Sequence, residues 1–528
     1  MKFYISNIKK LLIFAIISII LSLSSATVSY AAANPCFNST SQYIKVSEKY
    51  NLKVNNKISG SKYTWTSSDK KVATVSSTGT VKGIRTGEAK ITCSITAKSK
   101  TYKLACNILV INKDTTYTIT EGSKPSASIQ KKAAYNANTK DWYLFNELLT
   151  YCENAGGGKI VVKKGTYSIC GKVSIPSNVT LVLEDGVVIK KLAKTGTSSF
   201  AATKTMFQLV APSKASKEAV YSQYNGVHDV KIIGEGTATI DLDFMEGAVG
   251  FVMAHNQNIS FENINFANMN SGHFIEMDAS LNVTVLGCDF VGAKRSPKGN
   301  KEAINIDTPD KLTGGFSHVW SSFDKTPVKN LLVEDCRFED VDVGIGTHKY
   351  SQIQDANGEY TITMFHEDVH VKNCKFLNLW NSSFKMIAWK NVTVEDCLFE
   401  GGGLIADSDG QMVEASFRGF SANAVVDLTL INNLFKNIYW IGGASSSTGT
   451  APETASYVYT TIRSYITVEN IKGFYTNRCS NVKTPNIQLQ VDTFEASDEN
   501  VGQRLVSRPD LFGEGVKYSL TAEIPCID

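Results

Sequence analysis

The stretch that decides the fold is Asn258-Ile259-Ser260-Phe261-Glu262-Asn263-Ile264-Asn265-Phe266, because the same nine-residue phrase returns five more times. It recurs at residues 282–290, 330–338, 368–376, 391–399 and 427–435. The closing phenylalanines are 24, 48, 38, 23 and 36 residues apart, so the basic unit has about 23 residues and some units carry insertions. A repeat of this length that alternates apolar and polar residues predicts a solenoid of β-strands.

Each phrase opens on asparagine or aspartate, which suits a tight corner because these side chains tolerate left-handed backbone angles and bond their own main chain. Residues two apart on a strand point the same way, so Val283, Val285 and their equivalents are expected to face one core. The pattern therefore predicts a right-handed parallel β-helix.

Eleven cysteines raise the question of a disulfide framework. Four of them occupy the same inward position of the repeat, where free cysteine behaves as a small hydrophobic residue: Cys288, Cys336, Cys374 and Cys397. We interpret these four as a core ladder. Cys93 and Cys106 fall on neighbouring predicted strands, and whether they pair stays open. No CxxC pair or clustered His/Cys spacing indicates zinc, so no metal site is predicted.

Residues 1–33 have the features of a signal peptide. Lys2, Lys9 and Lys10 precede an apolar run over residues 11–23, and residues 31–33 are three alanines that suit cleavage. The run is short for a bilayer span, and no later stretch is apolar enough. We expect a secreted protein without a membrane span in its mature chain. The balance of 54 basic and 50 acidic residues gives no support to a nucleic-acid partner.

Residues 40–112 form a unit of short predicted strands that turn residues interrupt. Its phrases are Trp65-Thr66-Ser67-Ser68-Asp69, Val72-Ala73-Thr74-Val75, Gly79-Thr80-Val81-Lys82-Gly83 and Gly87-Glu88-Ala89-Lys90-Ile91-Thr92. These residues resemble the bacterial group 2 immunoglobulin-like domain. The resemblance implies a small β-sandwich in an extracellular bacterial protein, which acts as a spacer or associates with the cell surface. No catalytic set of residues is visible in this unit.

Residues 113–128 are expected to form a polar linker, and residues 129–528 the β-helix domain. An amphipathic pattern predicts a helix from Asp141 to Ala155, followed by a glycine run at 156–158 and a strand at 178–186. This order resembles the N-terminal cap and first turns of pectate-lyase-like and polygalacturonase-like β-helices. The expected fold class is thus all-β: a right-handed parallel β-helix with an N-terminal capping helix, preceded by a small Ig-like β-sandwich.

A second strand follows each phrase, and aligning Ile275, Ile304 and Ile345 as inward residues places polar side chains on one outward face. They are Glu276, Asp278, Asn305, Asp307, His348, Lys385 and Asp407. Neighbouring turns lie about 4.8 Å apart, so Asp278 and Asp307 are expected roughly 5 Å apart. Like charges directly opposite each other destabilise a sheet, which favours a functional reason for this pair. The alternative is that solvent or lysines such as Lys301 and Lys349 neutralise the pair.

Two carboxylates and a histidine on one groove suit the hydrolysis of a glycosidic bond, because one acid protonates the leaving oxygen while another carboxylate activates water or attacks the sugar. The predicted catalytic residues are Asp278, Asp307, His348 and Glu276. The predicted substrate-binding residues are His273, Asn305, Lys385, Asp407, Trp320 and Asp324. An adjacent pair of carboxylates fits retention of configuration and a diagonal pair fits inversion, so the stereochemistry stays open.

This face also resembles the polygalacturonase-type glycoside hydrolases, which carry N-T-D, D-D, G-H-G and R-I-K phrases on successive turns. Their equivalents here would be Glu276-Met277-Asp278, Asn305-Ile306-Asp307, Gly346-Thr347-His348 and Phe384-Lys385-Met386. None is a literal match, because the second Asp of D-D and the Arg are absent. The resemblance implies a sugar-cleaving β-helix without fixing the sugar.

Two insertions are expected to border the groove, since binding residues collect on loops of a rigid scaffold. Residues 291–301 are basic, with Lys294, Arg295, Lys298 and Lys301, and suit an acidic glycan or plain solvation. Residues 308–327 contain Trp320 and Asp324; packing inside the loop is the equal alternative to a sugar contact for Trp320. Glu302 and Glu339 are assigned to the surface.

Three functions compete. The predicted one is a glycoside hydrolase that needs no cofactor and acts on an oligo- or polysaccharide. The second is a polysaccharide lyase or epimerase, in which Lys349 or Lys385 removes a proton beside a uronate while aspartates hold Ca²⁺. The third is a non-catalytic glycan-binding surface protein, which the Ig-like domain supports. Asp307→Asn would leave such a binder intact and silence either enzyme.

Overall fold

The computed structural model describes residues 33–97, 100–294, 301–311, 314, 316–348, 351, 353–354, 356–357, 360–361, 364–401, 404–406, 412–414, 417–438, 440–445, 462–469, 473–477, 488–491 and 517–520. The chain divides into two compact units between Val110 and Ile111. The expected signal peptide lies outside the described residues, apart from Ala33. Across the described ranges, no helix is long and apolar enough to cross a membrane.

The first unit is all-β, as the sequence predicts. Its elements are β1 (Cys36–Phe37) paired with β4 (Val54–Asn55), a sheet of β2 (Ser41–Lys45), β9 (Lys100–Ile111), β8 (Gly87–Ala97) and β5 (Lys62–Ser67), and a sheet of β3 (Lys49–Asn51), β7 (Thr80–Gly83) and β6 (Ala73–Val75). Alternate residues of β8 are buried in one core. Cys93 and Cys106 both lie in this core as free thiols: Cys93 is opposite Leu104, and Cys106 is opposite Ile91.

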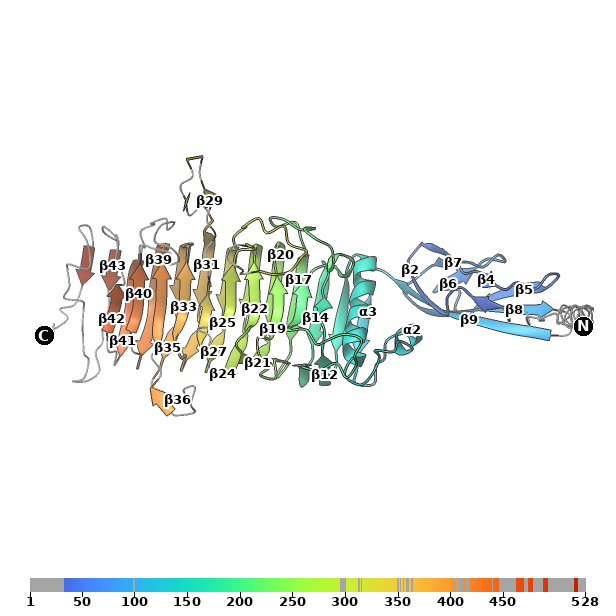
Figure 1. The fold of residues 1–528 in the computed structure, drawn as a ribbon, viewed down its shortest axis with the longest axis horizontal. Coiled ribbons are helices and arrows are strands. Elements are labelled where there is room, and N and C mark those ends of the chain that lie inside the picture. The colour runs from blue at the N-terminus through green and yellow to red at the C-terminus, as the bar shows by residue number, and fades with distance from the viewer. Residues whose placement is uncertain are drawn as a thin grey trace, which may run out of the picture. The chain divides into compact units, whose positions relative to one another are not determined.

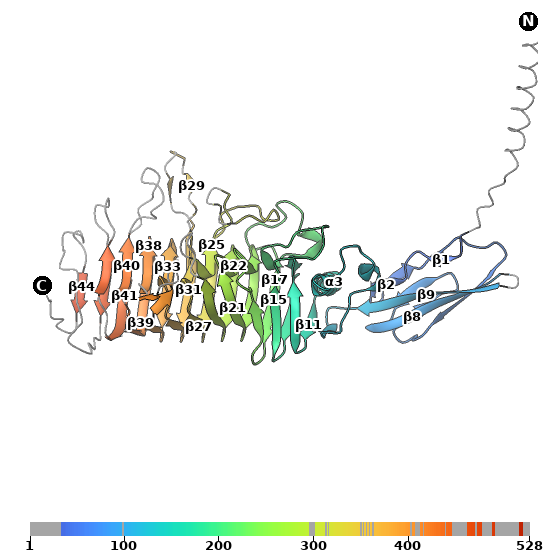
Figure 2. The same cartoon turned by 60° about the horizontal axis from the view of Figure 1, so that its bottom comes forward.

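The second unit is a parallel β-helix in which each turn contributes three strands (Figure 1). One turn consists of β20 (Asn256–Glu262), β21 (Asn265–Asn270) and β22 (His273–Asp278), and each pairs in parallel with its equivalent in the next turn. The predicted solenoid is confirmed. Figure 2 shows the same stack of turns after a rotation.

The stack has three faces, numbered in the order in which each turn visits them. The first face holds β10 (Thr116–Ile119), β11 (Gly158–Val162), β14 (Val179–Leu183), β17 (His228–Gly234), β20, β23 (Ser280–Leu286), β26 (Lys329–Glu334), β31 (His366–Lys372), β34 (Trp389–Glu395), β39 (Val426–Lys436) and β41 (Ile462–Glu469). The second holds β12 (Gly165–Ile169), β15 (Val187–Lys191), β18 (Thr239–Asp241), β21, β24 (Asp289–Lys294), β27 (Arg337–Glu339), β32 (Lys375–Leu377), β35 (Leu398–Glu400) and the end of β39.

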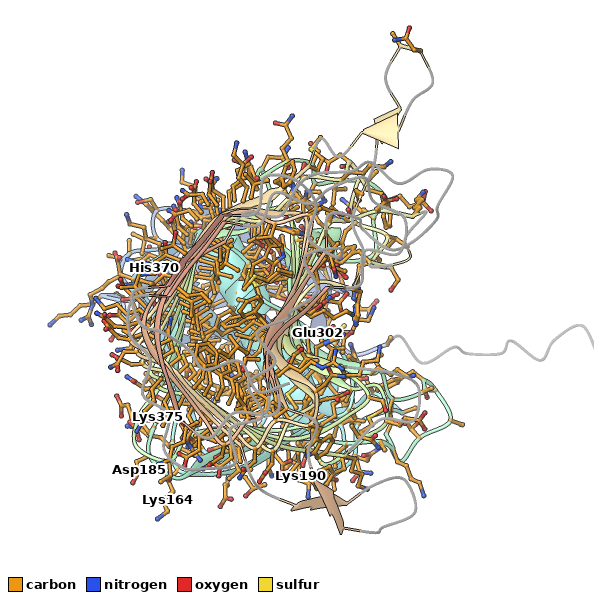
Figure 3. The ribbon with its side chains drawn as sticks, turned by 90° about the vertical axis from the view of Figure 1, so that its left-hand side faces the viewer. Lys164, Asp185, Lys190, Glu302, His370 and Lys375 are labelled. Carbon is orange, nitrogen blue, oxygen red and sulfur yellow. The ribbon has the colours of Figure 1, made fainter. Side chains whose placement is uncertain are left out.

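The third face is a separate ten-stranded sheet. It holds β13 (Val173–Ser174), β16 (Thr205–Leu209), β19 (Val249–Met253), β22, β25 (Glu302–Asp307), β28 (Val343–Gly346), β33 (Ser382–Ile387), β38 (Arg418–Asn423), β40 (Trp440–Ser445) and β42 (Gly473–Asn477). In the view along the stack, the labelled residue His370 lies on the first face, Lys190 and Lys375 lie on the second, and Glu302 lies on the third (Figure 3). The remaining elements are η1 (Pro212–Lys214) and the pairs β29 (Ile353–Gln354) with β30 (Tyr360–Thr361), β36 (Leu404–Ala406) with β37 (Met412–Glu414), and β43 (Gln488–Val491) with β44 (Lys517–Leu520).

The start of the β-helix differs in part from the expectation. Residues 113–128, expected to be a linker, contain β10, which pairs in parallel with β11 and so adds a strand to the first face. A short helix, α2 (Ala127–Gln130), follows. The predicted capping helix is present as α3 (Lys140–Ala155), with Leu144, Phe145 and Leu149 buried. Gly156 ends it in the left-handed conformation, which favours glycine at that position.

The corner residues that open each phrase are left-handed, as predicted. Their φ angles lie between 55° and 58° at Asn258, Asn282, Asn330, Asp368, Asn391 and Asp427. Their side chains also bond from turn to turn: the amide of Asn282 donates to Asn258 at 3.0 Å, and that of Asn330 donates to Asn282 at 2.7 Å. The same residue type therefore supplies both the bend and a bond along the stack.

The core confirms the inward ladder of cysteines. Cys288, Cys336, Cys374 and Cys397 are buried free thiols. The Sγ of Cys374 accepts the main-chain N–H of Cys336 at 3.4 Å, so the ladder also satisfies buried amides. The closing phenylalanines stack face to face, with ring centroids 4.3–5.0 Å apart from Phe266 to Phe435. Stacked apolar side chains thus fix each turn above the last.

Asn330→Ala is expected to lower the free energy of unfolding by about 1–3 kcal/mol, because alanine at a left-handed position is strained and the bond to Asn282 is lost. Urea unfolding monitored by circular dichroism measures the effect. Asn330→Gly removes the same bond but tolerates the positive φ, so it should cost less than Asn330→Ala. Equal costs would show that backbone strain contributes nothing at this corner.

Candidate functional site

The turns of the third face have the register that the sequence alignment predicts. Ile275, Ile304 and Ile345 occupy equivalent positions, and Phe384 continues the column. One residue later the column reads Glu276, Asn305, Gly346 and Lys385. Asp278 and Asp307 are direct neighbours on β22 and β25. The predicted polar residues are therefore brought together on adjoining strands.

The strands of this face interrupt the simple alternation of inward and outward residues. Phe274 lies in the core against Phe266 and Phe290, at ring-centroid distances of 5.8 and 5.9 Å, although the next residue, Ile275, is also fully buried. Ala303 and Ile304 repeat this on the next turn, both with no exposed surface. When two consecutive residues face inward, the residue before them faces outward, which a strict alternation would have placed inward. As a result, the carboxylate of Glu302 reaches the outward face.

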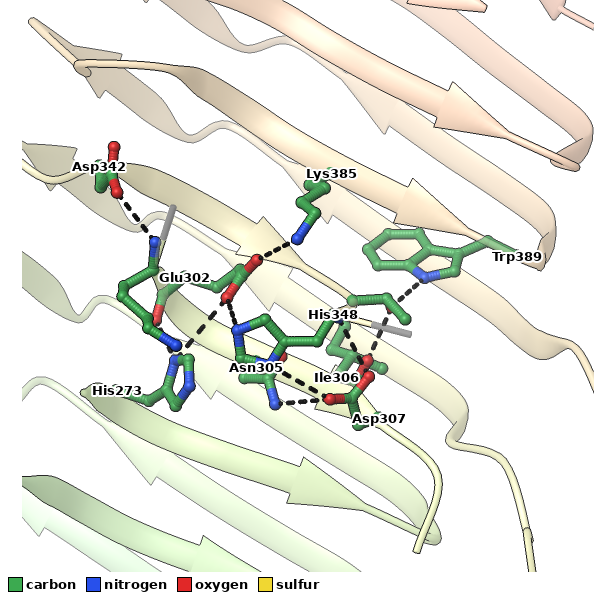
Figure 4. A network of polar contacts seen from close by, with 11 residues as sticks. His273, Glu302, Asn305, Ile306, Asp307, Asp342, His348, Lys385 and Trp389 are labelled. Atoms are coloured by element: carbon green, nitrogen blue, oxygen red, sulfur yellow. Dashed lines mark hydrogen bonds and ion pairs between the residues drawn. The ribbon is translucent and has the colours of Figure 1, made fainter. Parts of the chain in front are cut away.

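Glu302 is the centre of the resulting network, and its assignment to the surface was wrong. Its side chain has no exposed surface. Oε1 accepts a hydrogen bond from Lys385 Nζ at 3.1 Å, and Oε2 lies 2.7 Å from His348 Nε2 (Figure 4). A Cβ at Gly346 would lie 3.0 Å from Glu302 Cγ and 2.8 Å from Lys385 Cβ, so glycine makes room for this contact.

The charges of this network stabilise one another. Burial by itself raises the pKa of Glu302, but the contact with His348 and the charge of Lys385 outweigh burial and hold it well below its usual range. Burial likewise lowers the pKa of His348, whereas Asp307 and Glu302 raise it to a net value of about 9. An anionic Glu302 between a cationic His348 and Lys385 is therefore the favoured state at neutral pH.

Asp307 lies at the floor of the site and is held from three sides. Asn305 Nδ2 donates to its Oδ2 at 3.1 Å, and the main-chain N–H of His348 donates to Oδ1 at 3.1 Å. His348 Nδ1 is 3.3 Å from Oδ2. Only 1% of Asp307 is exposed. His348 thus contacts two carboxylates, one through each ring nitrogen.

The other two carboxyl groups are held in a different state. Asp278 is fully buried, and neither of its oxygens has a hydrogen-bond partner among the described residues. Burial, and then the neighbouring Glu276 and Asp307, raise the pKa of Asp278 well above its usual range. Burial and Asp307 also raise the pKa of Glu276, which is only partly exposed, to about 7. The third face therefore holds two carboxyl groups that favour the protonated form, Glu276 and Asp278, beside Glu302, which favours the ionised form.

Other predicted site residues lie elsewhere. Trp320 has no exposed surface and packs against Phe316 and Tyr221, at ring-centroid distances of 5.2 and 6.1 Å, so it is not placed to stack on a sugar. Asp324 accepts the main-chain N–H of Gln223 at 2.6 Å and thus joins two loops. Asp407 and Lys349 lie outside the described residues, as do Arg295 and Lys298. Glu339, expected at the surface, is partly exposed and pairs with Arg337.

His273 joins the network from the preceding turn. Its Nδ1 is 2.7 Å from the carbonyl oxygen of Glu302, and its ring centroid is 4.9 Å from that of His348. His273, Glu302 and His348 each offer one ligand atom, and these atoms all lie within 4.8 Å of one another. No sequence pattern indicates such a cluster, because its members come from three turns and have no spacing typical of metal ligands.

In the comparison with known protein families, a match was found for the first unit only. Residues 36–108 match the bacterial Ig-like domain (group 2), as expected from the sequence. No curated protein sequence matches the chain.

Among solved structures, the fold is similar to PfbA, a surface adhesin of Streptococcus pneumoniae, at 14% identity and a TM-score of 0.47 over 71% of this chain and 86% of that one. It is also similar to a family 28 exopolygalacturonase of Yersinia enterocolitica, at 12% identity and a TM-score of 0.37 over 84% of each chain. A third is the endo-xylogalacturonan hydrolase of Aspergillus tubingensis, at 11% identity and a TM-score of 0.39 over 77% of this chain and 99% of that one. At these identities the likenesses do not indicate an activity.

Proposed function

We propose that the protein is a secreted carbohydrate-active enzyme that hydrolyses glycosidic bonds in an oligo- or polysaccharide. The observation that carries the proposal is the presence, on one face, of two carboxyl groups with different surroundings. Glu276, with its pKa raised to about 7, keeps a proton to give to a leaving oxygen. Asp307, bonded by Asn305 and His348, supplies the carboxylate. Two carboxyl groups with separate roles are the minimum that glycoside hydrolysis requires.

The positions of the two groups favour inversion of configuration. Asp307 is one strand and two residues away from Glu276, which places their backbones about 8 Å apart. A diagonal pair of this kind fits inversion better than a directly adjacent pair does, because inverting enzymes keep their carboxyl groups far enough apart for a water molecule. With 1% of its surface exposed, Asp307 can contact only a molecule the size of water, and activating water is the task of an inverting base. Asp278, which is fully buried, remains neutral beside it.

The partly exposed groups around this pair would contact the sugar. The side chains of His348 and Lys385 are 23% and 26% exposed, so their polar atoms border the site from the following turns. The lyase alternative needs a lysine that accepts a proton, but Lys385 Nζ donates to the buried Glu302. Its engagement argues against Lys385 as the base, while Lys349, the other lysine considered for this role, lies outside the described residues. The Ig-like unit would then serve as a spacer or attach the enzyme to a cell surface.

The test is to incubate the secreted form with a panel of neutral and acidic glycans. New reducing ends without ultraviolet absorbance from unsaturated uronates support the hydrolase, and proton NMR of the first anomer formed reports inversion or retention. Unsaturated products would show a lyase instead. Glycan binding without any cleavage, equal for the wild type and Asp307→Asn, would show a binding protein.

The pH profile provides a sharper prediction. Because the proposed acid must be protonated, kcat is expected to fall as pH rises through about 7, the raised pKa of Glu276. Glu276→Gln should lower kcat by about 10²-fold and remove this alkaline decline, since glutamine does not titrate. Glu334→Gln, a partly exposed residue of the first face, is the matched control and should keep both the rate and the profile. An unchanged profile in Glu276→Gln would assign the proton donor to another group.

A further inference from the structure

We propose that His273, Glu302 and His348 form a binding site for one divalent transition metal ion. The three ligand atoms lie within 4.8 Å of one another. Glu302 Oε2 is 2.7 Å from His348 Nε2 and 4.0 Å from His273 Nδ1. Four-coordinate zinc at bond lengths of about 2.0–2.1 Å places its ligand atoms about 3.3 Å apart. The two distances fall on either side of that value, so a shift of under about 1 Å in each side chain would enclose an ion.

Two buried atoms of the cluster point to a missing partner. Glu302 Oε2 and His348 Nε2 are close enough for an ion pair, but their contact does not have the direction of a hydrogen bond. Both are among the buried polar atoms of the described residues that have no hydrogen-bond partner. Buried polar groups without a partner are rare and call for an explanation. An ion coordinated by both atoms would satisfy them together.

The surroundings of the cluster are those that orient metal ligands. Asp307 Oδ2 lies 3.3 Å from His348 Nδ1 and would accept a hydrogen bond from Nδ1–H, so a metal ion would displace the proton of Nε2, which faces Glu302. His273 Nδ1, which is 2.7 Å from the carbonyl oxygen of Glu302, would exchange that contact for the ion. Lys385 donates to Oε1 of Glu302 and leaves Oε2 for the ion. Glu302 and His348 are thus each held by a second contact.

The ligand types indicate the kind of ion. Imidazole nitrogens suit zinc, copper, iron and nickel, whereas calcium takes oxygen ligands almost exclusively. Two histidines and one carboxylate therefore select a transition metal, and this site differs in kind from the aspartate-held Ca²⁺ that a lyase would use. The proposed ligand atoms Glu302 Oε2 and His348 Nε2 are both buried, so the ion would be largely shielded from solvent.

Metal binding can be measured independently of any activity. The full-length secreted chain is stripped with a chelator, dialysed, and titrated with Zn²⁺ by calorimetry and with Co²⁺ by visible absorbance. We expect one equivalent of Zn²⁺, a four-coordinate Co²⁺ spectrum and a raised melting temperature of the metal-bound form. His273→Gln and Glu302→Gln should each weaken binding by at least about 10²-fold. Asp307→Asn, which loses only the support behind His348, should weaken it about 10–100-fold.

His370→Gln is the matched control, because His370 lies on the first face and contacts a carboxylate, Glu395, at 3.1 Å without a second histidine. It should bind Zn²⁺ as the wild type does. Melting of the metal-free variants, followed by circular dichroism, shows whether each variant is folded. If Glu302→Gln does not fold, His273→Gln still provides the test, because it keeps the charge network around Glu302. Absence of Zn²⁺ binding by the folded wild type, or equal binding by His273→Gln, would overturn the proposal. Neither result depends on whether the protein cleaves a glycan.

Discussion

Asp307→Asn is expected to reduce kcat on a cleaved glycan by about 10³–10⁴-fold, because asparagine has the same shape but cannot accept a proton from water. The amide oxygen can still accept from Asn305 and His348 Nδ1, while the amide nitrogen would lose the bond from the main-chain N–H of His348. Because Asp307 is almost fully buried, the loss should appear mainly in kcat rather than in KM. Steady-state kinetics with a reducing-end assay measure both constants.

Asp335→Asn is the matched control for this substitution. Asp335 stands at an exposed corner with φ 56°, a conformation that asparagine adopts equally well, so both kinetic constants should match those of the wild type. A fall of less than about 10-fold in Asp307→Asn would remove Asp307 from the role of base. It would also remove the main support for an inverting mechanism.

Glu302→Ala is expected to lower the free energy of unfolding by about 3–5 kcal/mol, because removing one member of a buried ion pair leaves the others uncompensated. The variant would leave His348 and Lys385 without their shared carboxylate. Denaturant unfolding at pH 6 in the presence of a chelator measures this cost without a contribution from bound metal. In the double variant Glu302→Ala/Lys385→Met the loss should be smaller than the sum of the two single losses. Additive losses would show that the pair does not interact.

The same network predicts a pH dependence of stability. The pKa of His348 is raised to about 9 in the folded protein, so its contribution is fully present below its ordinary pKa of about 6.5 and is lost as pH rises through 9. The wild type should therefore lose stability between pH 6.5 and 9. In Glu302→Ala this loss should be smaller, because one of the two carboxylates that raise the pKa is gone. Equal slopes in both proteins would assign the dependence to other groups.

The repeat made most of the fold predictable from the sequence. The asparagine or aspartate that opens each phrase sets a corner, and the corner fixes the register of the strand that follows, so the repeat alone was enough to place Asp278 and Asp307 side by side. The inward cysteines could be recognised for the same reason. The capping helix was also predictable, because its apolar stripe has the period of a helix.

The centre of the site could not be predicted, because it depends on a break in the alternation. Where two consecutive residues such as Ala303 and Ile304 face inward, a period of two no longer tells which way Glu302 points. The burial of Trp320 could not be predicted either, because it depends on contacts with Tyr221, a residue about a hundred positions away in the sequence. Contacts between distant loops leave no pattern in the local sequence.

The corner residues, core cysteines and stacked phenylalanines, which repeat from turn to turn, limit how the site on the third face can vary. Turns that differ as much as 48 and 23 residues in length end on phenylalanines stacked at similar distances, so extra residues enlarge the loops without displacing the strands. Equivalent positions on the third face are therefore separated by whole strand spacings of about 4.8 Å. The loops between the strands remain free to change in length and charge. A new substrate would thus require new loops, and a new reaction would require new residues at fixed steps along the stack.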